Sequence, residues 1–235
     1  MTEKEIYFRP KQAGRKLKTA LELGNAAYLY GVTGIGKTAL ARSLLAGKPY
    51  EYYTAEEAQP EEIPEKKEGK ERMIVIDDLH CVTLQEYQES YALLIKRLLE
   101  QESVKLILIS RAPVPGWLLS VHVEYRFIEI GERDFYFSRE EQDKYLRQSG
   151  LNLDSGFLQK AWELGKGHPV SLKILAMENG DLDRAVKSMW LWLENHVFDQ
   201  WEKELGEFLM ETSIVENERS RKLLKPEFPP FFSSF

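Results

Sequence analysis

The stretch that decides the fold is "GVTGIGKTALAR", residues 31–42. It contains the spacing G-x-x-x-x-G-K-[ST], with Gly31, Gly36, Lys37 and Thr38 at the fixed positions. Glycines in such a loop let backbone N–H groups turn inward around a pyrophosphate, and the helix that follows adds the positive end of its dipole. Lys37 is expected to reach the β- and γ-phosphates, and the Thr38 hydroxyl to ligate Mg²⁺. The stretch therefore predicts a site for a nucleoside triphosphate.

The loop is expected to hold the nucleotide along its whole length. The residues predicted to bind it are Thr33, Gly34, Ile35, Gly36, Lys37, Thr38 and Ala39, and Lys37 is also predicted to be catalytic. The context agrees with this mechanism, because the apolar run 26–30 reads as a strand and residues 37–46 show helical spacing closed by Gly47. The alternative is a glycine-rich turn that binds nothing.

A second stretch, "MIVIDDLH" (73–80), supplies carboxylates at the end of an apolar strand. Ligands of open α/β sheets bind at the carboxyl ends of the strands. Asp77 is therefore predicted to position Mg²⁺ together with Thr38, and Asp78 to orient or activate the attacking water. The alternative for both aspartates is capping of a strand–helix turn. His80 is interpreted as a turn residue.

A third polar group follows the apolar run "VKLILIS" (104–110). Ser110 and Arg111 stand at its end, and a basic residue beside the acidic strand can contact a γ-phosphate and report its loss. Arg111 is therefore predicted to be catalytic. The alternative is an ordinary exposed arginine at a strand end.

The first part of the chain alternates strands with helices. Five short apolar runs, 26–30, 50–54, 72–78, 104–110 and 125–130, read as strands, and residues 37–46 and 83–101 read as amphipathic helices. This alternation predicts an α/β fold of the P-loop NTPase type, three layers with a five-stranded, mostly parallel sheet. The charged connection 55–71 reads as a solvated loop.

After residue 137 the pattern becomes helical. Ser138 and Glu141 fit a capping box, and helices are expected over 139–149, 154–165, 168–179 and 181–213. The predicted domains are a nucleotide-binding domain at 1–135, an all-α domain at 136–205, and a truncated further domain or frayed tail at 206–235. Four tryptophans are interpreted as aromatic residues of the helical core: Trp162, Trp190, Trp192 and Trp201.

Composition excludes several classes of protein. The 235 residues carry a net charge of -6, which argues against a basic nucleic-acid-binding face, so no direct DNA contact is expected. Neither a secretory signal nor an apolar run long enough to span a membrane is found, and a cytoplasmic location is expected. The single cysteine, Cys81, is interpreted as a small packing residue.

These residues, read in order, resemble a known family. "YFRP" (7–10), the phosphate loop, "MIVIDDLH", "LILISR" and "GKGHPVSLKILA" (165–176) look like the nucleotide-binding module of the signal-transduction ATPases with numerous domains, and most like maltose-activator-like (LuxR-type) bacterial regulators. The resemblance extends over roughly residues 6–215. The chain departs from the family in one place: the connection between the second strand and the acidic strand is shorter than is usual in the family and lacks a helix.

The resemblance implies more than the motifs do. Pro169, in the turn Gly167-His168-Pro169, would contact the adenine side of ATP or ADP, and Arg9 and Pro10 would lie near the base. The alternative for Pro169 is a plain helix-start proline. The implied function is an ATP/ADP switch with slow hydrolysis in a signal-responsive transcriptional regulator, with further domains or protein partners. "FLMETSIVE" (208–216) looks like the start of a next domain.

Two other functions stay open at this point. An AAA+-type oligomeric ATPase would need additional arginines, for which Arg147 and Arg184 are candidates by helix position. A small-molecule kinase would need an arginine-bearing lid, and the basic stretch at 219–221 lacks that context. ATP is preferred to GTP because no N-K-x-D motif is present, which is mild evidence.

Overall fold

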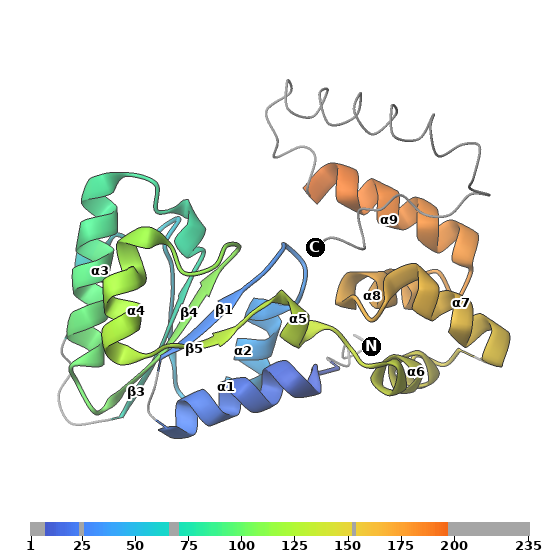
Figure 1. Ribbon diagram of the computed structural model, residues 1–235, viewed down its shortest axis with the longest axis horizontal. Coiled ribbons are helices and arrows are strands. Elements are labelled where there is room, and N and C mark those ends of the chain that lie inside the picture. Colours follow the sequence, from blue (N-terminus) through green and yellow to red (C-terminus); the bar gives the residue numbers. More distant parts are fainter. Residues whose placement is uncertain (1–7, 24–25, 66–70, 152–153, 197–235) are drawn as a thin grey trace. The chain divides into compact units, whose positions relative to one another are not determined.

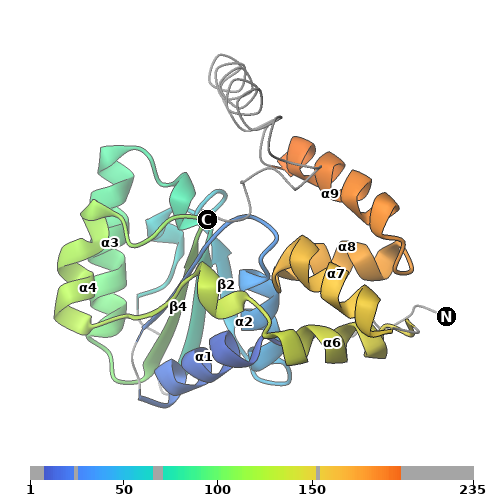
Figure 2. The ribbon, with the colours of Figure 1, turned by 45° about the vertical axis from the view of Figure 1, so that its right-hand side comes forward.

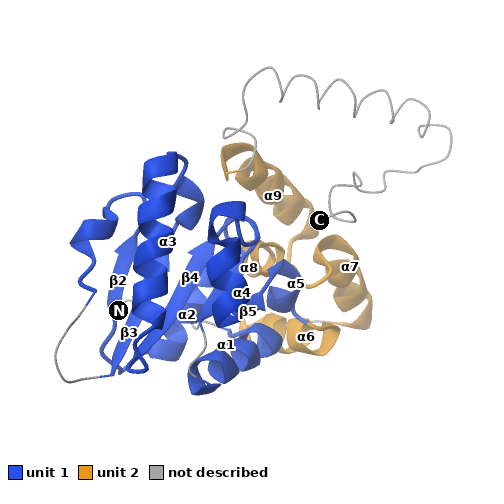
Figure 3. Cartoon of the chain, turned by 60° about the vertical axis from the view of Figure 1, so that its left-hand side comes forward, with its two compact units in different colours: residues 1–137 blue, residues 138–235 orange. Residues whose placement is uncertain are grey.

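The computed structural model describes residues 8–23, 26–65, 71–151 and 154–196 (Figure 1). The chain divides into two compact units, Met1–Phe137 and Ser138–Phe235 (Figure 3). The first is built on a β-sheet, and the described part of the second is helical. The domain limits expected from the sequence stay predictions, and the segment 206–235 lies outside the described residues.

The sheet of the first unit is parallel throughout. Its strands are β1 (Ala27–Tyr30), β2 (Glu51–Thr54), β3 (Arg72–Asp77), β4 (Val104–Ser110) and β5 (Ile128–Ile130), in the order β2-β3-β4-β1-β5. All four neighbouring pairs run parallel. The predicted five-stranded α/β fold is therefore confirmed. Because β4 lies between β1 and β3, its end stands between the phosphate loop and the acidic pair.

Helices cover both faces of this sheet. Helices α1 (Lys11–Leu23) and α2 (Lys37–Leu45) lie on one face, and α3 (Gln85–Leu99) and α4 (Leu119–Tyr125) lie on the other (Figures 1 and 2). Strand β4 shows why its sequence is apolar throughout. Leu106 and Leu108 belong to the core under α3 and α4, whereas Ile107 and Ile109 belong to the core under α1 and α2. Successive side chains point to opposite faces, so both sets are buried.

The outer strand β2 is fixed to β3 by an ion pair. Arg72 donates from Nε to Glu51 Oε1 and from Nη2 to Glu51 Oε2, both at 3.0 Å. The Arg72 side chain is only 4% exposed, so this bidentate pair is largely shielded from solvent. The register then sets Thr54 beside Asp77 and Tyr52 beside Val75.

Three local predictions in the first unit are wrong. The strand expected at 125–130 is shorter, because α4 continues to Tyr125 and Arg126 adopts a left-handed backbone (φ 51°) before β5. The connection 55–71 is not wholly solvated, because Ile63, after the short 3-10 helix η1 (Pro60–Glu62), is buried in the core. Cys81 is exposed, because in the 3-10 turn η2 (Leu79–Cys81) it is Leu79 that faces the core.

The second unit begins as the sequence predicts. The capping box at the start of α6 (Arg139–Gln148) is confirmed: Ser138 Oγ accepts from Glu141 N at 3.3 Å, and Glu141 Oε2 accepts from Ser138 N at 3.0 Å. The remaining helices are α7 (Ser155–Gly165), α8 (Pro169–Met177) and α9 (Leu182–His196). Trp190 on α9 is 46% exposed, so its assignment to the helical core is wrong. Trp201 lies outside the described residues.

The length and polarity of the helices decide whether any of them could cross a membrane. None that the structure describes combines the length and the apolar character needed to cross a bilayer.

Candidate nucleotide-phosphate site

The phosphate loop joins β1 to α2 through glycines whose positive φ angles would strain other residues. Gly36, at φ 101°, is the N-cap of α2, and its carbonyl accepts from Leu40 N at 2.8 Å. Gly31, at φ 142°, has a backbone that other residues rarely adopt, and a Cβ there would lie tightly against Glu132, 3.2 Å from its Cα. Both positions require glycine. The loop is anchored by buried Ile35, while Gly34 is exposed and Thr33 is half-buried.

Lys37 holds its charge inside this loop. Its Nζ donates to the carbonyl oxygens of Gly31, at 2.6 Å, and Val32, at 3.0 Å. The residue is 9% exposed, and burial lowers the pKa of Lys37 to about 8 although nearby Asp77 acts in the opposite direction. The ammonium is therefore protonated over most of the neutral range and stands at the N-terminus of α2.

Asp77 ties the loop to the acidic strand. Thr38 Oγ1 donates to Asp77 Oδ2 at 2.7 Å, and the backbone N–H of Asp78 donates to Asp77 Oδ1 at 2.8 Å. Asp77 is only 4% exposed. The two residues that the sequence assigns to the metal are thus in direct contact.

Asp77 has one further partner, which the sequence motifs do not predict. Tyr52 donates its hydroxyl to the same Oδ2, at 2.8 Å. The signal lies in the strand register: Thr54 is the neighbour of Asp77, and Tyr52, two residues earlier on β2, shares its face of the sheet. A tyrosine is long enough to reach the diagonal position on the neighbouring strand.

Asp78 follows in an unusual backbone conformation. Its φ of 57° and ψ of 32° are left-handed, which few residues other than glycine adopt and which aspartate tolerates. Burial raises the pKa of the Asp78 carboxyl, and the negative charge of Asp77 raises it further. His80 Nδ1 lies 3.9 Å from Asp78 Oδ1, and burial together with Arg111 lowers the pKa of His80. His80 lies within η2, the turn after β3.

Arg111 lies at the same edge, directly after the last residue of β4. Ser110 is buried and pairs in register with Tyr30 of β1, whereas Arg111 is exposed. The charge of Arg111 contributes to the lowered pKa values of both Lys37 and His80, so it acts on the groups of the phosphate loop and of the acidic pair. The topology therefore brings Lys37, Asp78 and Arg111 to one edge of the sheet.

Arg9 and Pro10 lie before α1 and contact α1 and α2. Arg9 donates from Nε to Ser43 Oγ at 3.2 Å and from Nη2 to the Ser43 carbonyl at 2.9 Å. Pro10 is buried, and its carbonyl accepts from Gly14 N at 2.9 Å. Their predicted place near the base stays a prediction.

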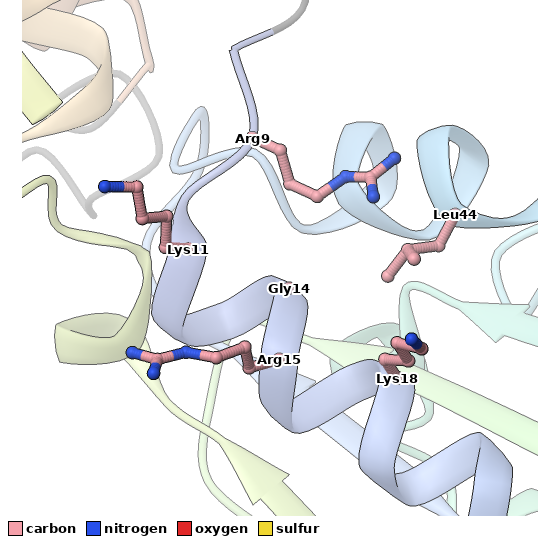
Figure 4. Close-up of a pocket in the computed structure, with 6 residues that line it drawn as sticks. All are labelled: Arg9, Lys11, Gly14, Arg15, Lys18 and Leu44. Carbon is pink, nitrogen blue, oxygen red and sulfur yellow. The ribbon is translucent and has the colours of Figure 1, made fainter. Parts of the chain in front are cut away.

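A hollow of about 500 Å³ lies between α1 and α2 (Figure 4). We call it the α1–α2 hollow; it is lined by Arg9, Lys11, Gly14, Arg15, Lys18 and Leu44. In Figure 4 the side chain of Arg9 extends towards α2, whereas those of Lys11 and Arg15 extend away from Leu44. Lys18 is paired with Glu22 at 3.5 Å. The four cations do not converge on one point.

The proline turn belongs to the second unit. Gly167 has φ 83°, His168 is the buried N-cap of α8, and Pro169 is its first residue. Proline suits that position because its missing N–H would have no partner in the helix. The local geometry agrees with a helix start, and the contact of Pro169 with adenine stays a prediction.

Comparison with known proteins supports the fold and a distant relationship. No family model matches the chain. It is similar to the HTH-type transcriptional regulators MalT of Vibrio campbellii, at 26% identity over 157 residues, and of Vibrio parahaemolyticus, at 26% over 161 residues. These matches cover 61% and 63% of this chain but only 17% and 18% of the relatives. The chain is thus distantly homologous to part of a larger regulator.

Solved structures share the fold at low sequence identity. The Walker-type ATPase PABY2304 of Pyrococcus abyssi superposes with a TM-score of 0.57 and 17% identity, covering 92% of this chain and 77% of that one. The AMPPCP-bound DnaA of Aquifex aeolicus gives 0.51 and 17%, covering 81% and 71%. The chain therefore has a P-loop ATPase fold.

Proposed function

We propose that this chain binds ATP or ADP with Mg²⁺ and works as a conformational switch with slow hydrolysis, as a module of a cytoplasmic, signal-responsive transcriptional regulator. The observation that carries the proposal is the 2.7 Å bond from Thr38 Oγ1 to Asp77 Oδ2. It joins the loop after β1 to the end of β3 and so assembles, at one edge of the sheet, the two protein groups that a phosphate-bound metal needs.

The residues present fit Mg²⁺ bound through a nucleotide. Among the residues described, no group of three or more His, Cys, Asp or Glu side chains gathers to hold a metal ion. A site of one carboxylate and one hydroxyl suits Mg²⁺, which keeps several waters and takes other oxygens from phosphates. Bound there, Mg²⁺ would neutralise charge on the β- and γ-phosphates. Thr33, Gly34, Ile35, Gly36, Lys37, Thr38 and Ala39 would hold those phosphates.

The remaining groups at the edge have separate roles in the proposal. Asp78 orients the attacking water, and its raised pKa moves it towards the range in which a carboxylate is an effective general base. Arg111 contacts the γ-phosphate and responds to its loss. Arg9, Pro10 and Pro169 contact the base side of the nucleotide.

The similarity to MalT supports a regulatory role rather than rapid turnover. Because the matches cover 17% and 18% of those relatives, the signal and the partners of the larger protein are part of the proposal. Further domains or protein partners would read the nucleotide state. The net charge of -6 supports leaving DNA contact to another domain.

The test begins with the nucleotide that accompanies the purified protein. Denaturation followed by ion-exchange chromatography is expected to release ADP or ATP, and small-angle scattering is expected to differ between protein saturated with ADP and with AMPPCP. Protein that neither carries nor binds an adenine nucleotide would contradict the proposal. Hexamers that form only with nucleotide would favour the ring-forming alternative.

A further inference from the structure

The carboxylate of Asp77 accepts hydrogen bonds from three donors, one of which, Tyr52, has no assigned role in the phosphate site. Oδ2 accepts from Thr38 Oγ1 at 2.7 Å and from the Tyr52 hydroxyl at 2.8 Å, and Oδ1 accepts from Asp78 N at 2.8 Å. Hydrogen bonds to an ionised carboxylate are among the stronger ones in proteins. With donors on both oxygens, the carboxylate plane cannot turn without losing one of them.

Tyr52 is itself held in place. The guanidinium of Arg42, on α2, lies over the Tyr52 ring, 5.0 Å from the centroid. The hydroxyl is the one hydrogen-bond donor of this side chain, and Asp77 Oδ2 accepts from it. A chain of contacts thus runs from α2 through β2 to the end of β3.

The role of Thr38 explains why a second donor on Oδ2 matters. A hydroxyl has one hydrogen and two lone pairs, so Thr38 can donate to Asp77 and still offer a lone pair to a metal. If the Asp77 carboxylate rotated, Thr38 could no longer donate to it and offer a lone pair to the metal at the same time. Tyr52, on the neighbouring strand β2, donates to the same oxygen and opposes that rotation.

We propose that Tyr52 is a positioning residue for the metal: its hydroxyl keeps Asp77 aimed at Thr38, and the Mg²⁺-dependent part of nucleotide binding depends on it. This inference rests on the proposed function. Tyr52 does not contact the nucleotide in this scheme, so nucleotide binding without metal is independent of the hydroxyl.

The chain provides a matched control in the next residue. Tyr53, also half-buried on β2, donates its hydroxyl to Glu51 Oε2 at 3.2 Å and not to Asp77. Tyr52→Phe and Tyr53→Phe each remove one hydroxyl and keep the ring. The experiment measures the dissociation constant of AMPPCP by calorimetry on the full chain, with Mg²⁺ and with EDTA. The ratio of the two constants is the metal coupling.

Tyr52→Phe is expected to reduce the metal coupling about tenfold, the scale of one hydrogen bond to a charged group. Its affinity in EDTA is expected to match that of the unaltered protein, and Tyr53→Phe is expected to leave both values unchanged. Arg42→Gln, which removes the cation over the ring, is expected to lower the coupling about twofold to threefold. Thermal unfolding of each variant verifies the fold.

Two results would overturn the inference: a coupling unchanged in Tyr52→Phe, or one reduced equally in Tyr53→Phe. A loss of affinity in EDTA by Tyr52→Phe would also count against it, because the hydroxyl would then act on the nucleotide or the fold rather than on the metal. If the unaltered protein fails to bind AMPPCP at all, the proposed function fails and this inference with it. The outcomes are therefore distinguishable.

Discussion

The carboxyl edge of the sheet and the α1–α2 hollow both carry cationic side chains, yet they differ in how those side chains are placed. The hollow has four, Arg9, Lys11, Arg15 and Lys18, whose ends diverge or are paired with other groups (Figure 4). The sheet edge has Lys37 in its loop and Arg111 beside it, together with Thr38 and Asp77. Residues along one helix face point outward, whereas parallel strands end at a common edge. The two regions therefore differ in whether their polar side chains gather in one place, and not in whether they carry positive charge.

The largest expected effect concerns chemistry at the sheet edge. Asp78→Asn keeps a residue that tolerates the left-handed backbone at φ 57° but removes the carboxylate that would orient the water. ATP hydrolysis is expected to fall by about a hundredfold or more, the range for loss of a general base. The measurement is phosphate release under single-turnover conditions, with AMPPCP affinity as the control. Unchanged hydrolysis would remove Asp78 from the mechanism and leave the edge as a binding site.

The next effect compares the two cationic regions directly. Lys37→Ala is expected to weaken ATP binding about a hundredfold, since two charge-assisted hydrogen bonds to phosphate are lost. Arg15→Ala, which removes a cation from the hollow, is expected to change the affinity less than about twofold. Calorimetric titration with ATP and Mg²⁺ measures both. Equal losses in the two variants would break the comparison, because the hollow would then also bind phosphate.

The smallest of these effects is a dependence on pH. The pKa of Lys37 is lowered to about 8 by burial, and a bound phosphate would favour the charged form and raise that pKa. Above pH 8, ATP binding would therefore take up a proton, and the ATP affinity is expected to fall by at most about tenfold per pH unit. Below pH 8, Lys37 is already protonated and adds no pH dependence to the affinity. Titrations in buffers of different ionisation enthalpy measure the proton uptake directly. An affinity that rises above pH 8 would contradict the assignment of Lys37.

Much of this edge could be predicted because its signals are local. The phosphate loop, the aspartates at 77–78 and Arg111 each follow an apolar strand within a few residues, and parallel strands bring such positions together without further information. Tyr52 could not be found in this way. Its contact with Asp77 depends on which strands are neighbours and on a register set by long-range pairing.

Two of the wrong predictions, those for residues 125–127 and for Ile63, have the same origin. Tyr125 and Phe127 have aromatic side chains that are common in strands, but α4 packs over the sheet and continues to Tyr125, and Phe127 is buried in the core under α3 and α4. Ile63 sits in a charged segment and is nevertheless drawn into that core. In both cases tertiary burial overrides the local pattern, as it often does for short segments.

The exposed position of Cys81 has a practical consequence. It is the only thiol of the chain, and it lies in the turn after the acidic pair, with its Sγ 3.8 Å from His80 Nε2. A maleimide dye will therefore attach at a single defined position in the turn after the acidic pair, without any engineered cysteine. Burial raises the pKa of Cys81, and nearby Asp78 raises it further, so the labelling proceeds faster in mildly alkaline buffer, where more thiolate is present. The unaltered sequence thus carries its own attachment point for a fluorescent label beside the candidate site.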